Sequence, residues 1–563
     1  MTIAALTTPE LALVESAVRR QPNLIQLMGH MRQRIEARRL AYVFGAGVSH
    51  PAGGPLWHEL INRLAPLYND PPSPLPAHSA TLVARYIFHR FSKRARATGN
   101  KIESIDADTA EVMVFDSWYK KIHDAIYEKV PDDVDEVFRQ HSYLRPLAWL
   151  VLNSRFCLTL NFDDILDRAA AALANESSNR FRRPHSIWSP QVVDRDDAAV
   201  IYHLNGFLPR EPGTTRSESV VLTEDSFADA AASSNGEANE YLMSRLFSNT
   251  VCVLGASLDD PSLRTAFYVA ARRNPSSFHY CILKDEDVTI DNVGEGERYD
   301  RFFANMELYN LITIFLSEKE IGAFIKMLAE PIDDFKNHLT QLGNRVGQET
   351  VRRYFLVGTV SCGKSSAISR LRTFNAHEEW GRPPPPTMYM DDSQLTPEER
   401  ERVLEFVLDQ LRYKNEWMVN AAYGIAVMDR APLDLCAFSQ SDAENQNKLA
   451  LLKQRVDPGG LAEGEIIHLE ADPAIIEKRQ IRRGRGDDWL KNKAYKQQRI
   501  AEQNARLRKI YDIDDGDAID TSKLGMNEVA RALAERMLLG DYKPCKLNKR
   551  LGDIVNGQKI VDP

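Results

Sequence analysis

The sequence is poor in cysteine and carries little net charge. Its 563 residues include six cysteines, and no two of them form a Cys-x-x-Cys pair. The sequence therefore predicts neither a disulfide framework nor a zinc knuckle, and this cysteine usage favours a reducing compartment such as the cytoplasm. Lysine and arginine total 71 against 79 aspartate and glutamate. A slightly acidic chain lacks the strong signature of a nucleic-acid-binding protein.

Long hydrophobic runs are lacking as well. The most apolar stretch, residues 147–162, is interrupted by Asn153 and Arg155, whereas a membrane-spanning helix needs about 20 predominantly apolar residues. The first twenty residues carry two glutamates and no basic segment ahead of an apolar run, so they do not resemble a signal peptide. We therefore expect no membrane span and a cytoplasmic protein.

The first half contains a series of short apolar runs with helical-looking segments between them. Several of these runs end in glycine or polar residues, as in a nucleotide-binding α/β unit. Alternation of this kind predicts a parallel sheet with helices on both faces. The runs are residues 40–44, 156–160, 200–202, 251–254, 280–283 and 311–315.

The same pattern starts again at Tyr354, with apolar runs at residues 354–357, 425–428 and 466–469. Two starts predict an α/β protein with two doubly wound, parallel-sheet domains. The expected segments are an N-terminal helical segment (1–39), a first domain (40–330) with a helical insertion at about 79–150, a helical linker (331–350), a second domain (351–540) and a polar tail (541–563).

Four fragments of the first domain carry polar or glycine residues at the end of an apolar run. In the first, Gly45-Ala46-Gly47-Val48-Ser49, the glycines would let the backbone approach a pyrophosphate. The others are residues 159–163, 202–206 and 255–261. Because the strand ends of an open parallel sheet meet at one edge, the four fragments predict a single ligand site.

Taken together, these residues resemble the sirtuin-like family, especially its bacterial anti-phage members. The resemblance covers about residues 40–320 and implies a Rossmann-type domain that binds NAD+. The residues that match the NAD-binding motifs are Gly45, Ala46, Gly47, Ser49, Trp57, Asn161, Asp163, Gly255 and Ser257.

The resemblance assigns a part of the dinucleotide to each motif. It implies that Asn161 and Asp163 hold the nicotinamide ribose and that the turn of Gly255 and Ser257 receives the adenosine side. Trp57 closes a Gly-x-Pro-x-aromatic loop, and residues 258–264 resemble the signature of the defence-associated branch.

The sequence also departs from sirtuin deacylases. Residues 207–251 contain no cysteine, so the four-cysteine zinc module of those enzymes is absent, as is their valine-rich substrate strand. Loss of the protein-substrate half favours hydrolysis of NAD+ to nicotinamide and ADP-ribose. Water would attack the ribose carbon through an oxocarbenium-like transition state. Transfer of ADP-ribose to another acceptor stays open.

The catalytic histidine of the family usually stands immediately before the glycine of the third fragment. Here that position is Asn205, and His203 lies two residues earlier. Positions i and i+2 of a strand face the same side, so we expect His203 or Asn205 to line the site, with His203 as the better proton acceptor. In the alternative interpretation His203 is a structural histidine and the domain only binds NAD+.

The second domain opens with residues 358–365, which satisfy the pattern Gly-x-x-x-x-Gly-Lys-Ser directly after an apolar run. In this motif the backbone N–H groups wrap phosphates, the lysine reaches the outer phosphates and the serine hydroxyl binds Mg²⁺. We therefore predict a site for ATP or another nucleotide, and for Mg²⁺. Its residues are Gly358, Gly363, Lys364, Ser365 and Ser366.

Residues 351–540 resemble the deoxynucleoside and nucleotide kinase branch of P-loop proteins. Asp429-Arg430 matches the acidic-Arg motif of that branch, which implies that Asp429 is a Mg²⁺ ligand or base and that Arg430 contacts phosphate. Residues 378–380 weakly echo its acidic substrate loop. The arginines that resemble its lid are Arg479, Arg483 and Arg485, although such a basic run is also typical of a solvated helix.

Three whole-protein hypotheses follow. In the first, an anti-phage effector hydrolyses NAD+ in an abortive-infection response, and a kinase-like sensor gates it by binding a nucleotide or a phage-derived trigger within a homo-oligomer. The second is a nucleoside or nucleotide kinase regulated by a catalytically silent NAD-binding domain. The third is a non-catalytic, nucleotide-gated assembly protein. Asn205 favours the second and third hypotheses, whereas the missing zinc module and the paired Asn161 and Asp163 favour the first.

Overall fold

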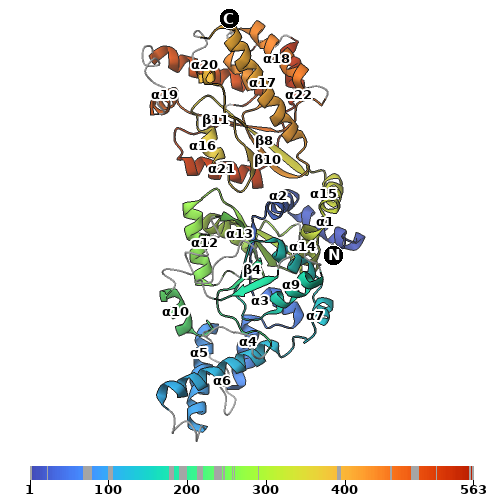
Figure 1. Cartoon of the computed structure of the whole chain (residues 1–563), viewed down its shortest axis with the longest axis vertical. Helices are drawn as coiled ribbons and strands as arrows, with labels where there is room; N and C mark the ends of the chain where they lie inside the picture. Colours follow the sequence, from blue (N-terminus) through green and yellow to red (C-terminus); the bar gives the residue numbers. More distant parts are fainter. Residues whose placement is uncertain are drawn as a thin grey trace. The chain divides into compact units, whose positions relative to one another are not determined.

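The chain folds into two compact units (Figure 1). The first unit comprises Met1–Pro22, Arg34–Arg273 and Phe278–Phe335, and the second comprises Asn23–Gln33, Asn274–Ser277 and Lys336–Pro563. The computed structural model describes every residue except 1–2, 22, 68–78, 99–105, 177–182, 189–198, 212–219, 234–243, 245–247, 257, 259, 290, 390–394, 440, 457–458, 483–492, 515, 557–559 and 561–563.

In the described part of the first unit, seven parallel strands form one sheet in the order β3-β4-β2-β1-β5-β6-β7. The strands are β1 (Leu40–Phe44), β2 (Phe156–Thr159), β3 (Pro184–Ile187), β4 (Ala199–His203), β5 (Thr250–Leu254), β6 (His279–Lys284) and β7 (Leu311–Leu316). The central strands are buried along their whole length, because helices cover both faces of a parallel sheet.

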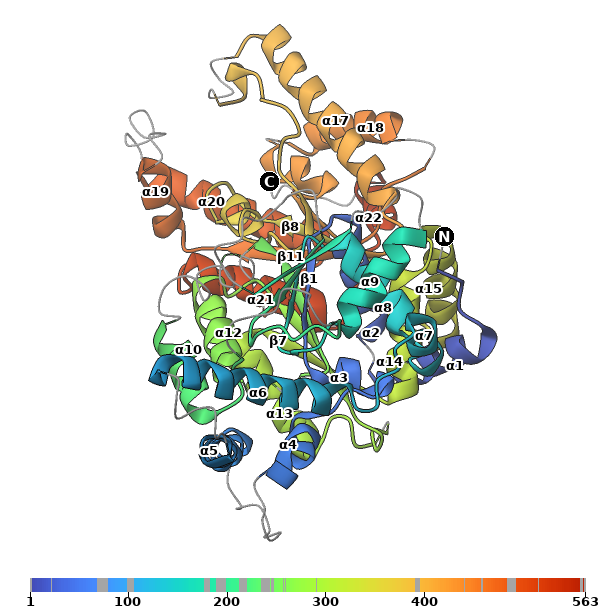
Figure 2. The same ribbon diagram turned by 60° about the horizontal axis from the view of Figure 1, so that its bottom comes forward.

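Alternate residues of the strands pack toward opposite faces of this sheet. Ala41 and Val43 point into a core with α12 (Pro261–Arg273) and α13 (Gly296–Tyr309). The opposite side is covered by α8 (Leu144–Asn153), α9 (Ile165–Glu176) and α14 (Glu318–Ala329) (Figures 1 and 2). Other described helices that precede β2 are α1 (Thr8–Arg20), α2 (Leu24–Glu36), α3 (Ala46–Ser49), α4 (Trp57–Leu64), α5 (Ala80–Thr98), α6 (Ala107–Tyr127) and α7 (Val134–Gln140), and α10 (Glu224–Ser233) follows β4.

The second unit is built around a five-stranded parallel sheet in its described residues, in the order β12-β11-β8-β10-β9. The strands are β8 (Val351–Val357), β9 (Asn375–His377), β10 (Gly424–Asp429), β11 (Glu465–Glu470) and β12 (Ile519–Asp520). Two all-parallel sheets with covering helices confirm the predicted α/β fold class.

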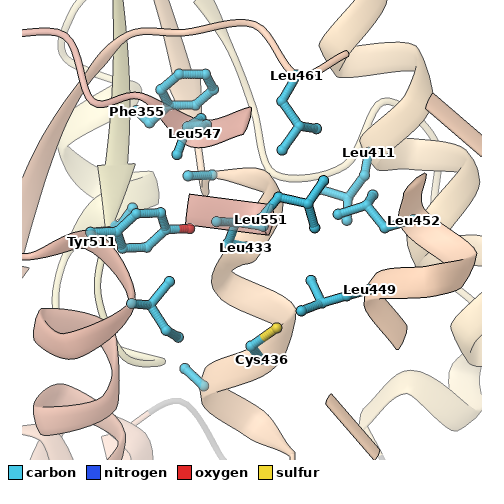
Figure 3. Packing of buried hydrophobic residues seen from close by; sticks show 14 of the residues in the cluster. Phe355, Leu411, Leu433, Cys436, Leu449, Leu452, Leu461, Tyr511, Leu547 and Leu551 are labelled. Atoms are coloured by element: carbon cyan, nitrogen blue, oxygen red, sulfur yellow. The ribbon is translucent and has the colours of Figure 1, made fainter. Parts of the chain in front are cut away.

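Helices cover the second sheet on both sides (Figures 1 and 2). One face, with Phe355 and Val357, packs into the hydrophobic cluster of Figure 3. On the other face, Tyr354 is buried and donates its hydroxyl to the Met537 carbonyl oxygen. From residue 332 onward the described helices are α15 (Ile332–Val346), α16 (Lys364–Ile368), α17 (Pro397–Val419), α18 (Asp442–Val456), α19 (Pro473–Arg482), α20 (Lys493–Tyr511), α21 (Met526–Leu539) and α22 (Leu547–Val555), with a 3₁₀ segment η6 (Pro432–Phe438).

The two ends of the chain differ from the sequence expectation. The expected polar tail, residues 541–563, includes α22, whose Leu547, Leu551 and Ile554 are buried in the cluster of Figure 3. The helical segment expected over residues 1–39 forms two helices, α1 and α2 (Leu24–Glu36). Residues 23–33 belong to the second unit, where the Gln33 side chain hydrogen-bonds the backbone of Tyr423 and Ile425. Within the described chain, no helix is long and apolar enough to cross a membrane.

Candidate functional sites

The first candidate site lies where the strand order of the first sheet reverses. β1 leads to β2 on one side, whereas its neighbour β5 leads to β6 on the other. In open α/β sheets, ligands bind beyond the carboxyl ends of the strands at such a point. Phe44 is paired with Thr159 and with Leu254, and Thr159 is paired with His203. The ends of all four strands that precede the predicted motifs are therefore aligned in one row.

Backbone contacts join the first and the fourth motif. The Gly47 N–H donates to the Gly255 carbonyl oxygen at 3.0 Å. A Cβ on Gly45 would lie 2.5 Å from the Gly255 carbonyl oxygen, and one on Gly255 would lie 2.6 Å from the Val48 nitrogen. Gly255 also has a φ of 70°, which L-residues rarely adopt. Glycine is therefore required on both sides of this contact, and Ala46 between the two glycines is partly exposed.

Side chains of three predicted residues form one hydrogen-bond network. The Asn161 Nδ2 amide donates to the Gly45 carbonyl oxygen at 3.2 Å and to Ser49 Oγ at 3.0 Å. The Ser49 hydroxyl donates in turn to Asp163 Oδ1 at 2.9 Å. Because both amide hydrogens of Asn161 are used, the direction of its carbonyl oxygen Oδ1 is fixed. The structure thus brings together the first two predicted motifs.

The Asp163 carboxyl group is buried, and burial destabilises its ionised form. Burial raises its pKa to about 6, although the N–H of Ile165 and the hydroxyl of Ser49 both donate to Oδ1 and oppose the shift. A carboxyl with a pKa near neutrality is a recurrent feature of functional sites.

The neighbouring Asp164 is a residue that the motif reading missed. Its Oδ1 accepts a hydrogen bond from the Tyr127 hydroxyl at 2.9 Å, and its Oδ2 accepts one from the Arg210 N–H at 2.9 Å. Burial raises the pKa of Asp164. The contacts tie helix α6 of the insertion and the segment after β4 to the start of α9. Its position beside Asp163 in sequence is the one signal that could have pointed to it.

His203 is buried, and both of its ring nitrogens are engaged. Nδ1 lies 3.1 Å from the Asn161 carbonyl oxygen, and Nε2 lies 3.2 Å from Asp167 Oδ1. Burial lowers the pKa of His203, but Asp167 and the Asn161 carbonyl outweigh burial and raise it. Because both neighbours are acceptors, the doubly protonated ring suits this position. Both ring nitrogens therefore lie against protein acceptors, and through Nδ1 the ring contacts the Asn161 segment.

Two further predicted residues flank this network, and a third lies outside the described residues. Asn205 is buried, and its Nδ2 donates to the Leu160 carbonyl oxygen at 3.3 Å. Trp57 is partly exposed at the start of α4. The centroid of its ring lies 6.1 Å from that of Phe162, the residue that separates Asn161 from Asp163 in the sequence. Ser257, the third residue predicted for this site, lies outside the described residues.

The second candidate site is the glycine loop after β8. β8 lies between β10 and β11, and the direction of the connections reverses between β8 and β11. A Cβ on Gly358 would lie 2.2 Å from the Leu469 carbonyl oxygen of β11. Gly363 has a φ of 115°, and Ser361 reaches 67°. A left-handed serine is uncommon and is typical of a loop whose shape serves a function.

Hydrogen bonds hold the two side chains that the motif predicts to bind phosphate and Mg²⁺, Lys364 and Ser365. The Lys364 ammonium donates to the Gly358 carbonyl oxygen at 2.8 Å and to the Thr359 carbonyl oxygen at 3.0 Å. The Ser365 hydroxyl donates to Asp429 Oδ2 at 3.0 Å. Ser366, the next residue of α16, is partly exposed.

The donor set around Asp429 fits a divalent cation. Asp429 is fully buried, and its Oδ1 has no hydrogen-bond partner among the described residues. A carboxylate oxygen beside a serine hydroxyl is the ligand type that Mg²⁺ prefers. The described residues contain no group of three or more His, Cys, Asp or Glu that could hold a metal. A cation here would therefore depend on oxygens supplied by a nucleotide and by water.

Arg430 is held between carboxylates. Its Nε donates to Glu379 Oε1, and its Nη1 lies 3.7 Å from Asp434 Oδ2. Burial lowers the pKa of Arg430, but Glu379 and Asp434 more than compensate and raise it. Burial also raises the pKa of Asp434 to about 6. Arg430 has a φ of 70°, so the backbone is strained directly after the predicted metal ligand.

Of the three arginines predicted to form a lid, the structure describes Arg479. Arg479 donates to the Thr521 carbonyl oxygen at 2.7 Å and to the Cys362 carbonyl oxygen at 3.4 Å. It is therefore bound to the backbone of the glycine loop, not held away from it on a solvated helix. Arg483 and Arg485 lie outside the described residues.

Comparison with known families assigns part of the first unit. Residues 155–310 match the family model of the SIR2-like domain. The match includes Asn161, Asp163 and His203 and confirms the sirtuin-like part of the predicted resemblance, while the Gly45 turn precedes it. No curated protein matches the sequence.

Proposed function

We propose that the first unit binds NAD+ beyond β1 and β5 and hydrolyses it to nicotinamide and ADP-ribose. One observation carries the proposal: the network of Ser49, Asn161 and Asp163 stands at the strand-order reversal, within and beside the residues that match the SIR2-like model. Oriented amide and carboxyl groups at that edge suit the hydroxyls and developing positive charge of a ribose.

The proposed reaction breaks the bond between ribose C1′ and the pyridinium nitrogen. Nicotinamide leaves with the electron pair of that bond, a water oxygen bonds to C1′, and the water proton passes to solvent. The fixed Oδ1 of Asn161 would orient the water, and Asp163 would hold the ribose and stabilise the cationic transition state. His203 would act through Asn161, whose carbonyl oxygen it contacts.

Nicotinamide release by the purified protein, measured with candidate activating nucleotides, tests this proposal. Counting free nicotinamide against free ADP-ribose separates hydrolysis from transfer to another acceptor. We expect Asn161→Ala to abolish release. An Asn161→Ala protein with full activity would remove the site assignment.

A second candidate function for this unit is NAD+ binding without turnover. The engaged ring of His203 favours it, because both nitrogens lie against protein acceptors. Heat of association with NAD+ but no nicotinamide release under any activating condition would support this function.

We further propose that the second unit binds a nucleoside triphosphate with Mg²⁺ and gates the first. The buried Oδ1 of Asp429 and the ordered Lys364 and Ser365 support a nucleotide site. The anti-phage role in a homo-oligomer rests on the sequence resemblance. We expect Lys364→Ala to abolish ATP binding. Phosphate transfer from ATP to a nucleoside or nucleotide, lost in the same variant, would instead favour a kinase.

A further inference from the structure

Lys414 is a buried lysine beside the glycine-loop site that no sequence motif identifies. It lies on α17, directly after the exposed Tyr413, and is 2% exposed. Its ammonium group donates to the Asp429 carbonyl oxygen and, at 3.3 Å, to the Glu379 carbonyl oxygen. Lysine is almost never fully buried unless it is paired. Here the hydrogen-bond partners of the ammonium group are two backbone carbonyl oxygens of the glycine-loop site.

The two carbonyl groups belong to the segments that carry the charged groups of the site. Asp429 ends β10 and receives the Ser365 hydroxyl. Glu379 follows β9 and pairs with Arg430. One ammonium group therefore fixes the backbone of the predicted metal ligand and the backbone of the carboxylate that orients Arg430.

The surroundings make this a costly position for a positive charge. Burial lowers the pKa of Lys414 to about 8, while Asp429 and Glu379 oppose that shift. The charged groups that face it are Asp429 at the end of β10, Arg430 directly after it, Glu379 after β9 and Asp434 on η6. A well-packed apolar residue would avoid the desolvation cost.

One turn earlier, α17 makes a second contact that serves as a comparison. Gln410 is also buried, and its Oε1 accepts a hydrogen bond from the Gly381 N–H at 2.8 Å. Residues i and i+4 share one face of a helix, so Gln410 and Lys414 both hold the segment after β9. Of the two, Lys414 is the one that also reaches Asp429.

We propose that Lys414 is a positioning residue that sets the Asp429 carboxylate to hold Mg²⁺ with a nucleotide bound on the glycine loop. The inference rests on the proposed nucleotide site and adds to it a residue on which the affinity for Mg²⁺ depends. Groups that orient a metal ligand typically change metal affinity by about 10- to 100-fold when they are removed.

The test compares ATP binding with and without Mg²⁺, by calorimetry on the full-length protein. We expect Lys414→Met to lower the Mg²⁺-dependent gain in ATP affinity by about tenfold, a larger loss than the loss in metal-free ATP affinity. Gln410→Ala, the matched buried control on the same face, should retain the Mg²⁺-dependent gain. Thermal unfolding of each variant checks its fold, and Lys414→Gln replaces Lys414→Met if the latter does not fold.

A double-mutant cycle identifies the route of the effect. If Lys414 acts through Asp429, Lys414→Met should have no further effect on the Mg²⁺-dependent gain in an Asp429→Asn background. An equal loss in both backgrounds, or an equal loss in Gln410→Ala, overturns the inference, and so does an unchanged gain in Lys414→Met. A wild-type protein that binds no ATP with or without Mg²⁺ overturns the nucleotide site itself.

Discussion

The hydroxyl of Ser49 donates a 2.9 Å hydrogen bond to the carboxylate of Asp163, which lies 114 residues further along the chain. Ser49 ends the short helix α3 after β1, and Asp163 precedes α9 after β2. Because β1 and β2 are neighbours in the sheet, the loops that follow them meet at one edge. This hydrogen bond connects Asp163 to the segment that follows the glycine turn. Substitution of either residue should therefore change the position of the other side chain.

Replacement of Ser49 by alanine should weaken both the fold and the site. Hydrogen bonds to charged groups contribute about 1.5–3 kcal/mol, and Ser49→Ala would leave Asp163 Oδ1 and the Asn161 amide each without one partner. We expect a loss of about 2 kcal/mol in the free energy of unfolding, measured by urea titration, together with reduced nicotinamide release. Ser248→Ala, at an exposed serine, is the control and should change neither quantity.

The buried pair of His203 and Asp167 should make stability depend on pH. The pKa of His203 is raised in the folded chain, so below about pH 6.5, the ordinary value for histidine, its full contribution to stability is present. The contribution is lost as the pH rises through the folded-state pKa. We expect the free-energy difference between wild type and His203→Gln to shrink over that interval.

Subtracting the variant from the wild type removes from this measurement the titrating groups that do not interact with His203. His141 and His279 have pKa values lowered by burial to about 4, and they destabilise the folded chain as the pH falls below about 6.5. They are present in both proteins and should cancel. A difference that stayed constant from pH 6 to pH 9 would contradict the ion pair.

The sequence predicted those strands that are buried on both faces. β1 and β5 are continuous apolar runs because they lie inside the sheet between two helix layers. The strands for which it offers no apolar run are β3, β9 and β12, which lie at edges of the two sheets. They are short and partly exposed, so their sequences carry no hydrophobic pattern that distinguishes them from loops.

The site residues also fall into two groups, those that a local sequence pattern predicts and those that tertiary contacts alone bring to the site. Glycine turns and strand-end polar residues have local signals, because the backbone geometry at a strand end limits which residues fit. Asp167 and Lys414 reach the sites from helices through contacts with residues distant in the sequence. No spacing rule locates such contacts before the tertiary structure is known.

Asp429→Asn should separate nucleotide binding from metal binding in the second unit. Asparagine keeps an oxygen that can accept the Ser365 hydroxyl but removes the charge of the buried, unpaired Oδ1. We expect ATP binding without metal to persist and the Mg²⁺-dependent gain in affinity to fall by about 10-fold or more, as measured by calorimetry. Asp541→Asn, at an exposed aspartate, should behave as wild type. Equal metal dependence in both variants would place the cation elsewhere.

The last helix, α22, should contribute to the stability of the second unit. Leu547 is fully buried in a cluster with Phe355, Leu433 and Tyr511 (Figure 3). Leu547→Ala would leave a cavity, and such changes cost about 2–5 kcal/mol. We expect a fall of that size in the free energy of unfolding, measured by urea titration and followed by tryptophan fluorescence. Lys549→Ala, on the exposed side of the same helix, should change it by less than about 0.5 kcal/mol. Equal stability of the two variants would mean that α22 packs only weakly against the core.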